Sequence, residues 1–361
     1  MKINKLVLKN YRTYKNATIE FSDGLNVFVG KNAQGKTNIL EAIFFAVIGR
    51  SFRTSKEKEV LTWGESSAYV KGEFSRTYRD VEIELVFSDK SKKTIKVDKI
   101  PLHRIGELMG NVNAIFFSPD ELKLVKESPD ERRRFMNIDI SQTNKRYFYL
   151  LGRYDKILAS RNKLLKTSKD IKVVKETIDI WDRALVDVAK KIASERAKFV
   201  TEIAPFARLA HSYISGGGEE LEVRYSGFTD DIENYDTLML KALQKNLEKD
   251  YKLGYTNVGV HRDDLDIFLN GVEVKAFGSQ GQQRTVALSL KLAELEIIKN
   301  RIGEYPILLL DDVFSELDSS RRKKLLKFTA KTQTILTCTD FLKESADAKI
   351  FEVVKGSIRR V

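Results

Sequence analysis

The residues best suited to chemistry in this sequence form one glycine-rich segment with the spacing Gly-x-x-x-x-Gly-Lys-Thr. Glycines let backbone N–H groups turn inward toward phosphate oxygens. Lys36 is expected to reach the β- and γ-phosphates of a nucleoside triphosphate, and the Thr37 hydroxyl is expected to bind Mg²⁺. The residues predicted to contact the nucleotide here are Gly30, Lys31, Asn32, Ala33, Gln34, Gly35, Lys36, Thr37 and Asn38.

The flanks of this segment favour a true phosphate-binding loop. Apolar residues within 25–29 predict a short buried strand before it. Apolar residues from Ile39 to Val47 recur at helical spacing after it. A helix that starts directly after the loop adds the positive end of its dipole to the phosphate site. A chance match in an ordinary turn is the alternative.

Two acidic residues near the other end of the sequence complement the loop. Asp311 and Asp312 follow the apolar run Ile307–Leu310, which predicts a buried strand that ends in paired carboxylates. Asp311 would then hold Mg²⁺ or its water ligands. Asp312 would orient the attacking water, which makes it the predicted catalytic carboxylate beside Lys36. Taken alone, the two acids are more typical of a strand that ends in a solvated turn.

A third motif, Ser-Gln-Gly-Gln-Gln-Arg at 279–284, precedes a strongly helical run. Ser279, Gly281 and Gln282 are therefore placed at a helix N-terminus, where backbone N–H groups bind anions. The plainer interpretation is an ordinary helix cap with Ser279 as the N-cap residue. Position alone leaves both interpretations open.

An arginine near the N-terminus is a further candidate for nucleotide contact. Residues 3–21 predict two strands joined by a loop over Asn10–Asn16, and this loop presents Arg12 ahead of the phosphate-binding segment. Arg12 is expected to meet a phosphate or the base. A solvated hairpin arginine is equally consistent with the spacing.

The charge balance indicates a polyanionic partner. The formal net charge is +12, and the isoelectric point is about 9.4. Such a surplus is typical of nucleic-acid binding, whereas a thermophile-like surface would explain many charges but not their one-sided balance. The candidate DNA-contacting residues are Arg50, Arg53 and Lys56 in the loop 49–56, then Lys90, Lys92 and Lys93, then Arg132, Arg133 and Arg134. Each cluster alone is more typical of solvated surface.

The remaining pattern divides the chain into a β-rich part and a helical part. Alternating segments predict strands at 68–75, 80–87 and 94–97, and an apolar run predicts a buried strand at 114–117. Helical spacing dominates 129–215, with a break at 167–170 and an end at the glycines 216–218. A strand at 220–225 and a helix at 236–247 follow.

Several protein classes are disfavoured by composition. The longest apolar runs are too short to span a bilayer, and the first residues lack the apolar segment of a signal peptide. The single cysteine, Cys338, excludes an internal disulfide. We therefore expect a cytoplasmic protein with no membrane partner.

Taken together, the motifs resemble those of ABC-type ATPases. Residues 279–283 are similar to the ABC signature motif, and Ser315-Glu316-Leu317-Asp318 resembles the D-loop. The order of the motifs along the chain is also the ABC order. Since the two halves of the nucleotide site lie near opposite ends of the chain, these ends must fold together, which is the plan of the SMC-like branch.

Within that branch the sequence resembles the RecF family. The further segments that carry the resemblance are LKNYR at 8–12, SPDELKLV at 118–125, RRRF at 132–135 and GVHRDD at 259–264. They cover nearly the whole chain. Two positions depart from the ABC pattern: Asp312 replaces the usual glutamate, and Thr339 stands where a switch histidine is usual. Slow ATP hydrolysis is consistent with both.

The resemblance implies an α/β fold: an ABC/SMC-type ATPase head assembled from N- and C-terminal segments, with an inserted helical arm and a signature-bearing lobe. On this plan residues 1–122 and 300–361 are the two parts of the first ATPase lobe, and 123–299 form the arm and the second lobe. ATP and Mg²⁺ are the implied cofactors. The implied assembly is an ATP-dependent homodimer in which Ser279 of one subunit closes the site of the other.

The function implied by the resemblance is that of a weak, DNA-stimulated ATPase. It would bind single- and double-stranded DNA, including gaps and single-strand/duplex junctions, in recombinational and gap repair, replication and the SOS response. RecO and RecR are the implied partners in loading RecA. Two rivals are the ATPase subunit of a membrane transporter and an ATP-binding DNA clamp with negligible turnover.

Overall fold

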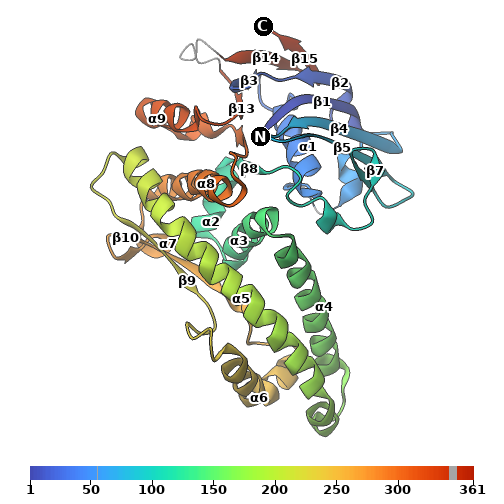
Figure 1. Cartoon of the computed structure of the whole chain (residues 1–361), viewed down its shortest axis with the longest axis vertical. Coiled ribbons are helices and arrows are strands. Elements are labelled where there is room, and N and C mark those ends of the chain that lie inside the picture. The colour runs from blue at the N-terminus through green and yellow to red at the C-terminus, as the bar shows by residue number, and fades with distance from the viewer. Residues whose placement is uncertain (55, 341–347) are drawn as a thin grey trace. The chain divides into compact units, whose positions relative to one another are not determined.

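The chain folds into two compact units. The computed structural model describes residues 1–54, 56–340 and 348–361. Ser55, within the predicted basic loop 49–56, lies outside the described residues. The first unit consists of residues 1–122, 210–218 and 287–361, and the second unit consists of 123–209 and 219–286. The N- and C-terminal segments, blue and red in Figure 1, therefore fold together as the motif order requires.

An antiparallel sheet forms one layer of the first unit. Its strands are β1 (Lys2–Tyr11), β2 (Tyr14–Glu20), β4 (Ser67–Ser75), β5 (Asp80–Ser88), β6 (Thr94–Val97) and β7 (Ile100–Pro101), in the order β2-β1-β4-β5-β6-β7. Along β4 and β5 buried residues alternate with more exposed ones, because one face of the sheet packs on the core. The strands predicted at 68–75, 80–87 and 94–97 are confirmed.

The loop predicted at 10–16 is shorter than expected. Tyr11 pairs with Tyr14 across the hairpin, so only Arg12 and Thr13 form the turn. Both tyrosines are fully buried, and their burial extends the strand pairing into the predicted loop. Arg12 has a positive φ of 53°, which a tight turn requires of one of its residues.

A mainly parallel sheet carries the two halves of the predicted nucleotide site. Its strands are β3 (Leu25–Val29), β8 (Ala114–Phe117), β12 (Ile307–Asp311), β13 (Thr334–Cys338), β14 (Lys349–Val354) and β15 (Ser357–Arg360), in the order β15-β14-β3-β13-β12-β8. β8 and β13 are buried along their whole length, as expected for parallel strands covered on both faces. Because β13 alone separates β3 from β12, the glycine-rich loop and the paired acids emerge at the same edge.

Helix α1 (Lys36–Ile48) follows β3 and is buried at nearly every position. It ends at Gly49, whose φ of 74° places the C-cap in the left-handed conformation. Among the residues that the structure describes, the other α-helices with residues in the first unit are α9 (Ser319–Thr329) and parts of α5 (Ile171–Ser215) and α8 (Gln280–Ile302).

The second unit is mainly helical. Its further elements are α2 (Lys123–Lys126), α3 (Pro129–Thr143), α4 (Lys145–Thr167), α6 (Tyr235–Leu253), α7 (Val274–Phe277), and the antiparallel strands β9 (Leu221–Ser226), β10 (Asp264–Leu269) and β11 (Val272–Glu273). The helix break predicted at 167–170 is confirmed between α4 and α5. The predicted strand at 220–225 and helix at 236–247 correspond to β9 and α6.

Charged groups are buried inside the second unit. Arg161 is completely buried and donates to Asp182 at 2.6 Å and to Asp250 at 2.9 Å. Arg196 is buried as well and donates to Asp263 at 2.7 Å. Removing one partner of such a buried ion pair strongly destabilises the fold. Within the described part of the chain, no helix combines the length and the apolar content needed to cross a membrane.

Candidate nucleotide-binding site

The glycine-rich loop has a conformation that its two glycines make possible. Gly35 has a φ of 109°, a region that other residues rarely adopt. A Cβ atom at Gly35 would lie 2.6 Å from Thr13 Oγ1, and one at Gly30 would collide with the Val353 carbonyl oxygen. Side chains at these two positions would therefore force the loop open, whereas Lys31, Asn32 and Ala33 between them are exposed.

The N-terminus of α1 is free of the groups that usually cap a helix. Its N-cap is Gly35, which has no side chain to cap the helix, and the first turn holds no acidic residue. Uncapped N–H groups and the positive dipole end both favour an anion at this place. The loop and the helix start thus suit the phosphates of a nucleotide.

The Lys36 ammonium lies along the loop rather than in solvent. Its Nζ donates to the carbonyl oxygen of Gly30 at 2.5 Å and to that of Lys31 at 3.0 Å. Burial lowers the pKa of Lys36, while the nearby carboxylates of Asp312 and Asp311 act in the opposite direction. Both hydrogen-bond partners are neutral carbonyl groups, so phosphate oxygens would be stronger acceptors for this cation.

Thr37 and Asp311 meet although they stand near opposite ends of the chain. The Thr37 hydroxyl donates to Asp311 Oδ1 at 2.9 Å. Burial raises the pKa of Asp311, and hydrogen bonds from Thr337 and Thr37 oppose that rise. A hydroxyl beside one carboxylate suits Mg²⁺, which takes few protein ligands and keeps water and phosphate oxygens for the rest. The described residues hold no cluster of three or more His, Cys, Asp or Glu that would suit another metal.

Thr337 is a site residue that the sequence did not reveal. Its Oγ1 donates to Asp311 Oδ1 at 2.7 Å and accepts from the Asp312 backbone N–H at 3.0 Å. Asp312 has a φ of 50°, which few non-glycine residues adopt and which aspartate tolerates better than most. Thr337 therefore orients both acids. In the sequence it is a β-branched residue in a buried strand and carries no other signal.

Arg12 is held by a buried glutamate of α1. Its Nε and Nη2 donate to the two carboxylate oxygens of Glu41 at 2.9 and 2.7 Å. The Glu41 side chain is fully buried and that of Arg12 is 17% exposed, so the alternative of a solvated arginine is wrong. Contact of Arg12 with the nucleotide stays a prediction.

Arg53 and Asn38 extend this network toward the basic loop. Arg53 Nη1 donates to Asn38 Oδ1 at 2.9 Å, and Asn38 Nδ2 donates to Thr13 Oγ1 at 3.1 Å. The Ser51 hydroxyl donates to Glu41. The predicted phosphate contact Asn38 thus uses its side chain to hold the hairpin turn. Gln34 is similarly engaged, because its Oε1 accepts from the Lys355 N–H at 2.7 Å.

The signature-like segment lies in the second unit, at the start of α8. The Ser279 hydroxyl accepts from the Gln282 N–H at 3.2 Å, and Gln282 Oε1 accepts from the Ser279 N–H at 2.8 Å. This reciprocal pair of hydrogen bonds is a capping box. Ser279 therefore caps α8, as the plainer interpretation predicts. Gly281 has nothing within 4 Å of an added Cβ, which leaves open space beside the helix start.

The basic candidates differ in what their side chains already do. Arg50, Lys56 and Lys92 are exposed. Lys93 is only 14% exposed and pairs with Glu57. Arg53 is 46% exposed and bonded to Asn38.

Arg132 and Arg133 do not suit the predicted role of DNA contacts. Arg132 is buried and donates from Nε and Nη2 to both carboxylate oxygens of Asp264, at 2.5 and 2.8 Å. Arg133 donates to the Asp263 carbonyl oxygen at 2.6 Å, and its side chain is 14% exposed. Their charge is used inside the second unit, since each guanidinium satisfies an acceptor of the 263–264 segment.

Relatives of known identity match the whole chain. A family model described as the RecF/RecN/SMC N terminal domain matches residues 2–355. A protein of Alkaliphilus oremlandii named DNA replication and repair protein RecF is 43% identical over 367 residues, which cover 99% of this chain and 100% of that protein. A protein of the same name from Ruminiclostridium cellulolyticum is 43% identical over 371 residues, which cover 99% of each.

Solved structures agree with these relatives. A structure of the recombination mediator protein RecF with ATP, described as part of the RecFOR pathway, has a TM-score of 0.93 at 35% identity and covers 99% of this chain and 97% of that chain. The Smc head domain of Pyrococcus furiosus, with a TM-score of 0.59 at 18% identity over 99% of this chain and 95% of that chain, supports the fold alone. The predicted fold class is confirmed. The chain therefore belongs to the RecF/RecN/SMC N-terminal domain family and, within it, to the RecF family.

Proposed function

We propose that this protein is an ATP-dependent DNA-binding protein of replication and recombinational repair, with weak, DNA-stimulated ATPase activity. The observation that carries the proposal is the 2.9 Å hydrogen bond between Thr37 and Asp311 beside an uncapped P-loop helix. That pair joins the two halves of a Mg-nucleotide site from distant parts of the sequence. The relative solved with ATP supports the same ligand.

Each site residue has a defined task in this proposal. The loop N–H groups and Lys36 bind and orient the phosphates, because oriented donors and a point charge match their oxygens. The Thr37 hydroxyl and the Asp311 carboxylate hold Mg²⁺. When bound, Mg²⁺ neutralises charge on the β- and γ-phosphates. Asp312, fixed by its backbone bond to Thr337, orients the attacking water or accepts its proton.

A second copy of the chain completes the site in this proposal. Ser279, Gly281 and Gln282 start a long helix, and the open space at Gly281 allows an anion to approach the backbone. In an ATP-dependent homodimer with two-fold symmetry, each copy would present this helix start to the nucleotide of the other. The three-segment division at residues 122 and 299 belongs to the same proposal.

DNA binding rests on the charge surplus and on the exposed basic loops. Arg50, Lys56 and Lys92 are exposed to solvent and could contact phosphate oxygens, and contacts of this kind carry little sequence information. Single- and double-stranded DNA and their junctions would all be ligands. The pathway in the description of the solved relative supports RecO and RecR as partners in RecA loading, with roles in gap repair and the SOS response.

A clamp that binds ATP without turnover is the second candidate, because Asp312 replaces the glutamate usual in ABC ATPases. Single-turnover hydrolysis separates it from a working ATPase. The alternative of a transporter ATPase subunit has less support, since such a subunit has no use for the surplus of positive charge.

The decisive experiment is a titration of fluorescent duplex and gapped DNA with and without MgATP, alongside molecular mass by light scattering. We expect ATP to convert a monomer into a dimer and to strengthen DNA binding. The matched pair is Thr37→Val, which removes the hydroxyl, and Thr37→Ser, which retains it. Thr37→Val is expected to lose the gain in ATP affinity that Mg²⁺ supplies. DNA binding indifferent to ATP, or a full Mg²⁺ effect in Thr37→Val, would contradict the proposal.

A further inference from the structure

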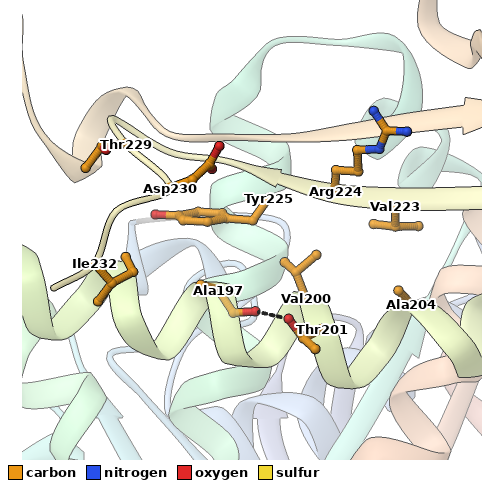
Figure 2. Close-up of a pocket in the computed structure, with 10 residues that line it drawn as sticks. All are labelled: Ala197, Val200, Thr201, Ala204, Val223, Arg224, Tyr225, Thr229, Asp230 and Ile232. Atoms are coloured by element: carbon orange, nitrogen blue, oxygen red, sulfur yellow. Dashed lines mark hydrogen bonds between the residues drawn. The ribbon is translucent and has the colours of Figure 1, made fainter. Parts of the chain in front are cut away.

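A hollow of about 210 Å³ lies in the second unit between α5 and β9. Figure 2 shows Ala197 and Val200 on the helix below it, and Val223 and Tyr225 on the strand above. The segment 229–232 borders one end. Drug-sized ligands occupy pockets of roughly 300 to 1,000 Å³, so this smaller hollow is of a size for a single side chain.

The hollow exists because small residues face the strand. Ala197 and Ala204 stand seven positions apart, two helical turns, on the side of α5 that also presents Val200. Protein interiors are close-packed, and larger residues at the two alanine positions would fill the gap. The border residues Thr201 and Asp230 are exposed, so the hollow opens to solvent.

The aromatic wall is held rigidly. The Tyr225 hydroxyl donates to Asp263, and Asp263 also accepts from Arg196 Nη1 at 2.7 Å. Arg196 is 2% exposed. A tyrosine ring fixed by a buried ion pair presents a preformed apolar face, which reduces the loss of conformational entropy on binding. Tyrosine is also among the residues enriched at energetically important interface positions.

The mouth of the hollow is acidic. Asp230, Asp231 and Glu233 are exposed at its border or directly after it. Hydrogen bonds from the side chain and the N–H of Asn234 hold the pKa of Asp231 below its usual range, which keeps this carboxylate ionised.

Two basic side chains beside this acidic border, Arg224 and Lys190, are already paired. Arg224 points away from α5 in Figure 2 and pairs with Glu222 at 2.6 Å, and Lys190 pairs with Asp236 at 2.8 Å. Within the described residues Asp230 forms no ion pair. In a protein with a net charge of +12, an acidic border of this kind would repel a DNA backbone and attract a cationic group.

We propose that this hollow is a docking slot for a partner protein, and that it takes one bulky apolar side chain adjacent to a lysine or arginine. The apolar side chain enters between Ala197, Ala204 and the Tyr225 ring. The cationic neighbour lies against Asp230. The slot uses no residue of the nucleotide site.

Capped tetrapeptides test the slot in the full-length protein labelled with ¹³C at alanine methyl groups. The first peptide is Lys-Lys-Leu-Lys, the second has serine in place of leucine, and the third has glutamate in place of every lysine. We expect the first to shift the methyl signals of Ala197 and Ala204. The serine peptide should bind at least roughly tenfold more weakly, which corresponds to about 1.4 kcal/mol, because it buries no apolar side chain.

Matched variants test the apolar part and the acidic part of the slot separately. Ala204→Leu fills the hollow and should abolish the shift at Ala197, with folding checked by thermal unfolding. Asp230→Lys should weaken the first peptide several-fold and reduce the salt dependence of its binding. Glu176→Lys, the same charge change at an exposed position of α5 outside the slot, should leave peptide binding unchanged.

Four outcomes would overturn the proposal. These are no methyl shift with the first peptide, an equal response to the serine peptide, methyl shifts caused by a short DNA duplex instead, and methyl shifts caused by protein concentration alone. The third outcome would assign the slot to nucleic acid, and the fourth would assign it to a second copy of the chain.

Discussion

Arg161 in the second unit and Lys36 in the first unit are both buried cations, but they are satisfied in different ways. In the second unit, Arg161 reaches two carboxylates and the Thr256 hydroxyl. In the first unit, Lys36 reaches only two backbone carbonyls, and Asp311 accepts from two threonine hydroxyls. No ion pair joins Lys36 to Asp311 within the described residues.

This difference separates charges that hold the fold from charges that hold a ligand. A guanidinium between two carboxylates has no reason to exchange its partners, because the alternatives are weaker acceptors. An ammonium on neutral carbonyls gains from phosphate oxygens, and a carboxylate on hydroxyls gains from a divalent cation. Substitution of Arg161 should therefore affect mainly stability, and substitution of Lys36 should affect mainly nucleotide binding.

The largest effect is expected from Arg161→Leu. The substitution leaves Asp182 and Asp250 buried and facing each other without a cation, which destabilises by about 3–5 kcal/mol. Urea unfolding measures the change, with Trp181 on α5 as the fluorescent reporter in a Trp63→Phe background. Arg183→Leu is the control, because its ion pair with Asp179 is exposed and exposed pairs contribute little to stability. Equal destabilisation in both variants would refute the distinction.

The next effect is on nucleotide affinity. Lys36→Met should bind ATP roughly 30- to 150-fold more weakly, since about 2–3 kcal/mol of charge-assisted hydrogen bonding is removed. Its unfolding free energy should change by less than about 1 kcal/mol, because both bonds are only partly buried and water can replace the lysine at the two carbonyl oxygens. Calorimetry gives the affinity. Lys31→Met is the control, since that side chain is exposed and only its backbone is expected to face phosphates.

The nucleotide loop and the paired acids could be predicted because each motif is local in the sequence. The role of Gly35 depends on its left-handed backbone, that of Lys36 on its charge, and that of Asp311 on its place at the end of a strand. All three features can be inferred from the neighbouring residues in the sequence. The structure then adds the meeting of Thr37 with Asp311, which the motif order had implied.

Residues whose partners are distant in sequence could not be predicted. Arg132 resembled a surface cation because its neighbours are basic, whereas its partner Asp264 stands 132 positions away. Glu41 looked like any polar residue of a helix, yet it is fully buried against Arg12. A single sequence shows which residues are charged but not which charges pair across the fold.

A substitution at Thr337 tests how the two acids of the first unit are oriented. Thr337→Val retains the shape of the side chain but removes both hydrogen bonds to the acid pair, which should lower the unfolding free energy by about 1–3 kcal/mol. Single-turnover ATP hydrolysis should fall as well, because the Asp312 N–H keeps only its bond to the Thr337 carbonyl oxygen at 3.2 Å and the residue is oriented less firmly. Thr337→Ser retains the hydroxyl and should preserve both properties. Full hydrolysis in Thr337→Val would show that this residue supports the strand alone.

The smallest effect is expected from substitutions in the basic loop, because salt in the solvent screens the interactions of exposed charges. Arg50→Glu with Lys56→Glu should weaken duplex binding in MgATP and leave ATP affinity unchanged. The slope of log K against log salt should become shallower by about 0.9 for each phosphate group that the variant no longer neutralises. Fluorescence anisotropy between about 50 and about 200 mM salt measures this slope.

Lys9→Glu with Lys15→Glu is the control, because it changes the net charge equally at exposed positions on the hairpin of β1 and β2. If both pairs flatten the slope to the same extent, net charge alone drives DNA binding, and the basic loop has no special role. If only the first pair does, the available charges of the first unit bind DNA, whereas Arg132 and Arg133 are already used inside the second.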